Sequence, residues 1–201
     1  MVFPRQERMI ALTFDDGPKP GPTNEILDIL SENQAKATFF VLGNNVTQHP
    51  DITRRIVQEG HDIGVHSLSH PNFQETEIFE VYRELIDSTL LLEDLLGIQI
   101  KYVRPPYGFS TAEAQFLFNR IGLQSILWTY DTLDWEILDA EVIARNLLDN
   151  IQPGDIILLH DIHPTTAQAM QIAIPQLVDQ GYELVTISEL LEAQGDTFIL
   201  N

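Results

Sequence analysis

Two adjacent carboxylates stand at the end of an apolar segment near the start of the chain. Asp15 and Asp16 follow residues 9–14, which are apolar almost throughout, and Gly17 and Pro18 come directly after them. An apolar run of this kind is typical of a strand buried on both faces of a parallel sheet. The same residues also suit a simple turn, because Asp bonds its own backbone and Gly adopts positive φ readily. Both interpretations stay open on these residues alone.

Two histidines four residues apart, His66 and His70, follow a later predicted strand. With a carboxylate from the first strand end they form a set of two imidazoles and one carboxylate. Such a set can hold a divalent metal and leave positions open for water and substrate. The alternative interpretation is a pair of exposed loop histidines. The set also occurs at the iron of non-haem oxygenases, so oxygen chemistry is a second possibility.

Three more predicted strands end in polar side chains. Arg104 begins a turn rich in proline, where its guanidinium can hold a carboxylate, or can simply lie on the surface. Asp131 and Asp134, with Trp135, follow the next strand, and His160 ends the most apolar strand of the chain. A histidine in that place is usually either a satisfied core residue or a catalytic one.

The elements that would position these residues alternate in type along the chain. Short β-branched or aromatic segments alternate with longer segments of helical period, which predicts successive βαβ units and a parallel sheet. The predicted strands lie near residues 9–14, 37–42, 62–66, 100–103, 124–130, 155–160 and 183–185. The longest predicted helix, from about residue 75 to 96, is amphipathic and is expected only to cover the sheet.

The number of these units favours one architecture. Seven strand–helix pairs in about 200 residues fit a closed or nearly closed α/β barrel of parallel strands with outer helices better than an open sheet. All five polar clusters fall at carboxyl ends of predicted strands, which is where such folds bind ligands. The sequence therefore predicts that the clusters meet in one site.

Composition excludes several classes of function. The chain has 201 residues, 44% of them hydrophobic, which predicts one domain over residues 1–201. Thirty acidic residues against eleven basic ones give a net charge of -19, which predicts no nucleic-acid partner. No cysteine is present, so disulfides and a cysteine nucleophile are excluded. No membrane span is expected, because no apolar run approaches ~20 residues, and residues 1–8 lack a signal-peptide core.

The five polar segments together resemble a known family. Residues 13–18, 66–70, 104–108, 131–135 and 158–160 are similar to the five ordered motifs of the polysaccharide deacetylases, the NodB-homology family or carbohydrate esterase family 4. The resemblance spans about residues 9–190. It implies a distorted (β/α)7 barrel that removes acetyl groups from N-acetylated sugars with one divalent metal ion, commonly Zn²⁺, with Co²⁺, Ni²⁺ or Mn²⁺ as alternatives. It also implies a secreted or cell-envelope location.

The resemblance implies a role for each matching position. Metal ligands are implied at Asp16, His66 and His70. A general base is implied at Asp15, oriented by Arg104. We therefore expect Arg104 to contact Asp15.

The remaining motif residues complete the implied reaction. A general acid is implied at His160, with Asp134 as its charge partner, and we expect these two side chains to be in contact. The backbone N–H of Tyr107 is implied as an oxyanion donor. The implied substrate pocket is lined by Trp135, Leu158 and Pro105.

The identity of the acetylated substrate is left open by these residues. The expected substrate is the N-acetylglucosamine of chitin oligomers or of peptidoglycan. The protein itself is expected to be a monomer. The alternatives are an O-acetyl xylan esterase of the same family and a catalytically silent carbohydrate-binding domain. The histidines outside the motifs are expected on the surface or in loops, at His49 and His61, and at the rim of the site, at His163.

Overall fold

A computed structural model describes residues 8–195 of the chain. Its strands are β1 (Met9–Asp15), β2 (Thr38–Val41), β3 (Asp62–Val65), β4 (Tyr102–Val103), β5 (Gln124–Ser125), β6 (Tyr130–Asp131), β7 (Ile156–His160) and β8 (Glu183–Leu184). Its helices are α1 (Pro22–Glu32), α2 (Gly43–Gln48), α3 (Pro50–Gln58), α4 (Ile78–Leu96), α5 (Ala112–Arg120), α6 (Asp134–Ile137), α7 (Ala140–Asn150), α8 (Pro164–Asp179) and α9 (Ile187–Ala193).

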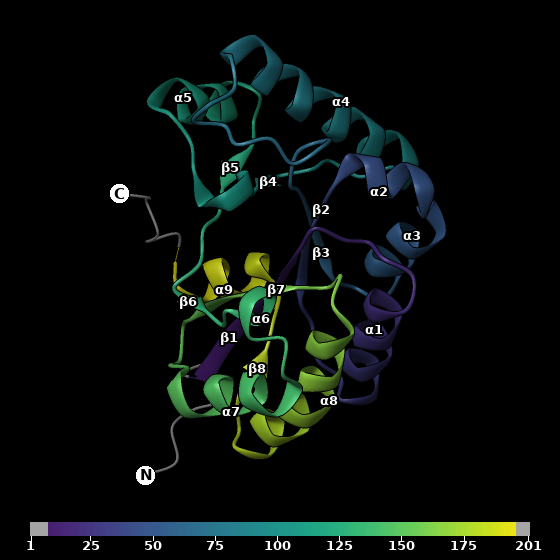
Figure 1. The fold of residues 1–201 in the computed structure, drawn as a ribbon, viewed down its shortest axis with the longest axis vertical. Helices are drawn as coiled ribbons and strands as arrows, with labels where there is room; N and C mark the ends of the chain where they lie inside the picture. The colour runs from purple at the N-terminus through teal and green to yellow at the C-terminus, as the bar shows by residue number, and fades with distance from the viewer. Residues whose placement is uncertain (1–7, 196–201) are drawn as a thin grey trace.

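The strands form one curled parallel sheet with β1 near its middle (Figure 1). The strand order is β5-β4-β3-β2-β1-β7-β6, and β8 pairs with the first two residues of β1. In register, Asp15 lies opposite Phe40 of β2 and His160 of β7. The predicted distorted (β/α)7 barrel is confirmed, and the carboxyl end of β1 lies beside the carboxyl end of β7 as the site requires.

The side chains of β1 alternate between two apolar clusters. Leu12 and Phe14 belong to the larger cluster, which lies between the sheet and its helices, whereas Ala11 belongs to a smaller cluster on the opposite face. Thr13 and Asp15 therefore share the face of Ala11, because successive side chains of a strand point to opposite sides. Both faces of β1 are buried, which explains why its sequence is apolar almost throughout.

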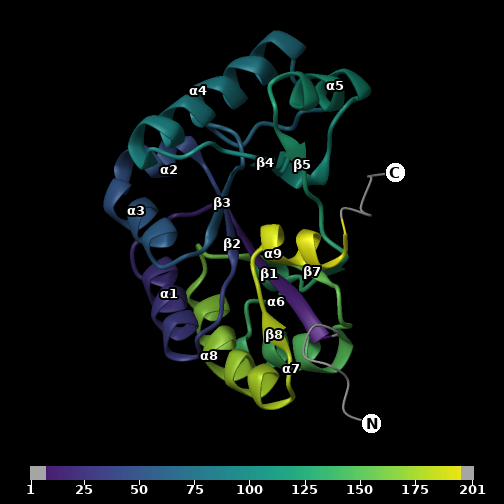
Figure 2. The same ribbon diagram turned by 180° about the vertical axis from the view of Figure 1, so that it is seen from behind.

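Most helices form an outer layer around the sheet. Figure 1 shows α4, α2, α3, α1 and α8 succeeding one another along one side of the molecule, and Figure 2 shows the same order from behind, with β8 and α9 near β1. Within residues 8–195, none of the helices has both the length and the apolar character that crossing a bilayer requires.

The predicted fifth strand, 124–130, was wrong as a single element. The structure divides it into β5 and β6, which pair with β4 and β7 respectively. Between them, the carbonyls of Ile126 and Leu127 accept hydrogen bonds from the Arg104 side chain, at 3.1 and 3.4 Å. Among the described residues no ladder joins β5 to β6, so the barrel is open at this place and the guanidinium bridges part of the gap.

His61 was expected at the surface or in a loop; it does lie in the loop before β3, but it is buried there and not at the surface. His61 is 6% exposed, and its Nδ1 accepts a hydrogen bond from the Ala37 backbone N–H at 3.2 Å. Burial, aided by the nearby charges of Lys36 and Arg55, lowers the pKa of His61 to about 4. The imidazole is therefore neutral in the folded chain.

This neutral histidine predicts a loss of stability in acid. An unfolded histidine binds its proton near pH 6.5, whereas folded His61 resists protonation until about pH 4. The unfolded chain binds more protons between these values, so the free energy of unfolding falls as pH falls from 6.5 to 4. His61→Asn can still accept from Ala37 and should show a shallower fall, measured by urea unfolding across this range. Parallel pH curves for the two proteins would contradict the prediction.

Candidate active site

The carboxyl ends of the strands enclose a cavity of about 560 Å³. Its lining includes residues from all five of the polar segments that follow predicted strands. These lining residues are Asp15, Asp16, His66, His70, Tyr107, Asp131, Trp135, Leu158 and His160. The prediction that the clusters meet is confirmed in position, because residues far apart in the sequence face one shared space.

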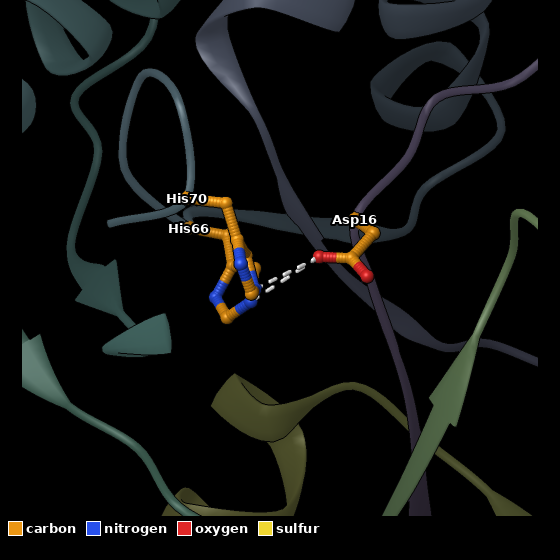
Figure 3. Close-up of side chains that lie close together, drawn as sticks. All are labelled: Asp16, His66 and His70. Carbon is orange, nitrogen blue, oxygen red and sulfur yellow. Dashed lines mark ion pairs between the residues drawn. The ribbon is translucent and has the colours of Figure 1, made fainter. Parts of the chain in front are cut away.

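Asp16, His66 and His70 form a compact group at one side of this cavity (Figure 3). One candidate ligand atom from each residue lies within 4.8 Å of the other two. Asp16 Oδ1 lies 3.5 Å from His66 Nε2 and 3.3 Å from His70 Nε2. Figure 3 shows both imidazoles on the same side of the group, with their nitrogens directed at the carboxylate.

The hydrogen bonding of this group fits a divalent cation. Asp16 Oδ1 is buried and has no hydrogen-bond partner among the described residues, which is costly for a carboxylate oxygen unless a cation contacts it. His66 Nδ1 lies 2.7 Å from the Arg104 carbonyl, to which it donates, so Nε2 keeps its lone pair for a metal. Burial lowers the pKa of His66 to about 3, against the opposing charge of Asp16, and keeps the ring neutral.

The backbone around the group adopts an unusual conformation. Asp16, Ser67, His70 and Tyr107 all have positive φ, between 60° and 75°. Non-glycine residues in this region carry about 1–3 kcal/mol of strain each, and such residues gather at functional sites. The Asn45 side chain donates to the Asp16 carbonyl at 2.7 Å and helps to hold that strained residue.

Asp15 lies beside this group but points toward a different partner. Its Oδ1 accepts a hydrogen bond from Arg104 Nη1 at 2.8 Å, while its Oδ2 lies 3.8 Å from His66 Nε2. The same Nη1 donates to Thr13 Oγ1 at 2.7 Å, and the Arg104 side chain is 0% exposed. Burial raises the pKa of Asp15 above the usual carboxyl value, and the Arg104 charge limits that rise. The carboxylate is thus a stronger base than an exposed aspartate.

A second charged pair lies across the cavity. His160 Nδ1 is 2.8 Å from Asp134 Oδ1, and Asp134 Oδ2 accepts from the His160 backbone N–H and the Thr166 hydroxyl. Burial lowers the pKa of His160, but the hydrogen bond and charge of Asp134, with the charges of Asp15 and Asp16, outweigh it and raise the value to about 9. The imidazole therefore carries a proton at neutral pH.

Not every predicted pocket residue faces the cavity. Trp135, which is 49% exposed, and Leu158 both line it, and the rings of Tyr107 and His70 form a T-shaped contact with 4.6 Å between their centroids. Pro105 is buried at the start of the Tyr107 turn and is not among the lining residues. Its implied substrate contact stays a prediction.

Several contributors were not predicted as site residues. Phe109 and Trp128 line the cavity, and Thr13 and Thr166 hydrogen bond to the Arg104 and Asp134 side chains. For Phe109 the sequence did offer a signal, since this aromatic residue lies two positions after Tyr107. For the other three residues it offered none. His163 lines the cavity, as expected for a rim residue, with its ring centroid 6.3 Å from that of His160.

Comparisons with known proteins relate this chain to polysaccharide deacetylases. The family profile described as "Polysaccharide deacetylase" matches residues 4–126. The peptidoglycan-N-acetylglucosamine deacetylase PgdA of Listeria monocytogenes is 40% identical over 92% of this chain, which spans 39% of that protein. The chain therefore covers about two fifths of the length of this relative.

One further protein, and one solved structure of part of another protein, match over nearly their whole length. A chitooligosaccharide deacetylase of Azorhizobium caulinodans is 38% identical, over 90% of this chain and 93% of that protein. The solved structure of the peptidoglycan deacetylase PdaC from Bacillus subtilis superposes with a TM-score of 0.91 at 38% identity, covering 96% of this chain and 95% of that one. Both likenesses exceed what a shared fold alone would give.

The buried Arg104–Asp15 pair predicts an unequal response to two arginine substitutions. Arg104→Met leaves the Asp15 carboxylate buried without a partner and should lower the free energy of unfolding by about 3–5 kcal/mol. Arg54→Met breaks an exposed pair with Asp51 and should cost about 0–1 kcal/mol. Urea unfolding of the metal-free variants measures both values, and similar small losses would contradict the assigned burial of the charge.

Proposed function

The chain belongs to the polysaccharide deacetylase family, and on that premise we propose that it hydrolyses the acetyl groups of N-acetylated sugars in a polysaccharide or oligosaccharide. The observation that carries the proposal is one cavity lined by the Asp16–His66–His70 group, a carboxylate base and a protonated imidazole. The names of the relatives support the substrate class, since they describe deacetylases of peptidoglycan and of chitooligosaccharides. N-acetylglucosamine units of such glycans are the proposed substrate.

Amide hydrolysis needs a nucleophile, stabilisation of a developing oxyanion and a proton for the leaving amine. The residues proposed to hold one divalent ion, most simply Zn²⁺, are Asp16, His66 and His70. When bound there, such an ion would supply Lewis acidity, which lowers the pKa of a water and polarises the acetyl carbonyl.

Asp15 is the proposed base. One of its oxygens is fixed on Arg104, which leaves Oδ2 beside the metal group to take a proton from the attacking water. Its raised pKa strengthens it for that task. We propose that the backbone N–H of Tyr107 donates to the oxyanion.

His160 is the proposed acid. Asp134 holds Nδ1, so Nε2 is the nitrogen that can deliver its proton to the departing sugar amine. Trp135 and Leu158 belong to the apolar part of the cavity wall, and we propose that they line the place of the acetyl methyl group.

The other functional classes considered from the sequence do not use this arrangement. An iron oxygenase needs no buried acid and base beside its metal, and a carbohydrate-binding domain needs neither proton transfer group. We therefore propose hydrolysis over both, with residues 1–201 as a single catalytic domain.

The proposal is tested by acetate released from N-acetylglucosamine oligomers and from peptidoglycan. Zinc-loaded parent protein should release acetate, and Asp15→Asn should bind the same amount of zinc while losing turnover by at least about 100-fold, because the base is removed. Asp16→Asn should bind less zinc than the parent, because a proposed metal ligand is replaced.

Metal content and acetate must be measured on the same samples for this comparison. An exposed substitution, Asp87→Asn, serves as the control and should match the parent in both. If Asp15→Asn keeps its turnover, the proposed base is wrong. Acetylated xylan is assayed in parallel, and if the parent protein releases acetate only from xylan, the proposed substrate class is wrong.

The proposed acid, His160, predicts that activity is lost at alkaline pH. His160 must be protonated to act, so activity should fall as pH rises through its pKa of about 9. Asp134→Asn removes the charge that supports this pKa and should move the alkaline limb of the pH–rate profile to lower pH. An unmoved limb would show that another group donates the proton.

A further inference from the structure

The loop that joins the two histidines of the metal group is held on one side through its carbonyls. Ser67 O accepts from the Gly43 backbone N–H of α2 at 3.0 Å and from the Ser88 hydroxyl of α4 at 3.1 Å. Leu68 O accepts from the Asn44 N–H at 3.0 Å. The packing is close, because a Cβ at Gly43 would lie 2.7 Å from a Leu68 methyl carbon.

The N–H groups of the same loop are held by one side chain, Glu84 of α4. Its Oε2 accepts from the backbone N–H groups of Leu68 at 2.9 Å and Ser69 at 2.8 Å. Its Oε1 accepts from the Ser69 hydroxyl at 2.7 Å. Glu84 and Ser88 are four residues apart on α4 and so project from one face of the helix toward the loop.

The conformation of the loop requires such contacts. Ser67 and His70 have φ of 74° and 70°, and each of these strained residues must be held by its surroundings. Within the loop, the His70 N–H donates to Ser67 Oγ at 2.8 Å, which restrains only the turn itself. The backbone N–H of His66, where the turn begins, donates to Val41 O of β2 at 3.0 Å, and the contacts from α2 and α4 hold the rest of the turn relative to the sheet, and therefore relative to Asp16 after β1.

We propose that Glu84 is a positioning residue for the metal group, acting through the backbone of Leu68 and Ser69 on the placement of His70. Glu84 does not line the cavity, so it contacts neither substrate nor the reacting atoms. Hydrogen bonds to a carboxylate are stronger than neutral ones, which suits a group that must hold a strained turn. The inference rests on the proposed function only in taking a divalent ion as the ligand.

The side chains offer a matched set of variants. Glu84→Ala removes all three acceptor contacts. Glu84→Gln keeps one carbonyl oxygen, which can accept both backbone N–H groups, and an amide that can donate to Ser69 Oγ. Glu80→Ala is the control on the same helix, since Glu80 is exposed and its carboxylate lies 3.8 Å from the Arg83 guanidinium, and no hydrogen bond or ion pair joins its side chain to residues 66–70 within the described part of the chain.

The test is the zinc dissociation constant of the full chain, measured by competition with a chromophoric chelator. Glu84→Ala should weaken zinc binding by about 10-fold or more, as loss of groups that orient metal ligands does, whereas Glu84→Gln and Glu80→Ala should stay near the parent. Hydrogen exchange of the zinc-free chain should be faster at Leu68 and Ser69 in Glu84→Ala alone. Thermal unfolding of the zinc-free variants separates this effect from a general loss of stability.

Several outcomes would overturn the proposal. They are an unchanged zinc affinity in Glu84→Ala, an equal loss in Glu80→Ala, or a fall in thermal stability without any change in affinity. Were Glu84→Ala not to fold, Ser69→Ala, which removes one of the three contacts, should still weaken zinc binding, and no change there would contradict the role.

The affinity measurement is independent of turnover. A parent protein that binds zinc but releases no acetate would refute the proposed function while the variants still decide the role of Glu84. A parent without zinc affinity would overturn both.

Discussion

The buried ion pair between Arg104 and Asp15 is the interaction on which the rest of the site depends. A guanidinium with no exposure to solvent lies inside the curled sheet, with the ring of Phe40 4.2 Å below its central carbon. Its donors reach Thr13 and Asp15 on β1 and the carbonyls of Ile126 and Leu127 between β5 and β6. One side chain therefore joins the middle of the sheet to its open edge. A buried charge of this kind is tolerated only when such partners surround it.

The pair also explains how two adjacent aspartates come to differ. Asp15 ends a regular strand, so its side chain falls on the inner face with Thr13 and meets Arg104. Asp16 has left the strand with a φ of 75°, and its carboxylate turns toward the histidines instead. The Arg104 carbonyl contacts His66 Nδ1, so the same residue orients both the proposed base and a proposed metal ligand.

The motif residues could be predicted because polar side chains at the ends of apolar strands have few structural reasons to be there. The contacts around the motif residues could not be predicted from the sequence. The split of strand 124–130 depends on a side chain that takes the place of a neighbouring strand, and no local pattern reports this. His61 is buried by a tertiary contact with Ala37. Glu84 and Thr166 are ordinary polar residues of amphipathic helices until the fold brings each of them to a partner.

The central claim is that the neighbouring carboxylates divide their work, with Asp16 on the metal and Asp15 on Arg104. A crystal structure of the zinc-loaded chain, with the ion located by anomalous scattering, tests it most directly. The account predicts one zinc ion bound by Asp16, His66 Nε2 and His70 Nε2, with Asp15 still hydrogen bonded to Arg104. Zinc bound by Asp15, or an Arg104 side chain turned away from it, would contradict the account.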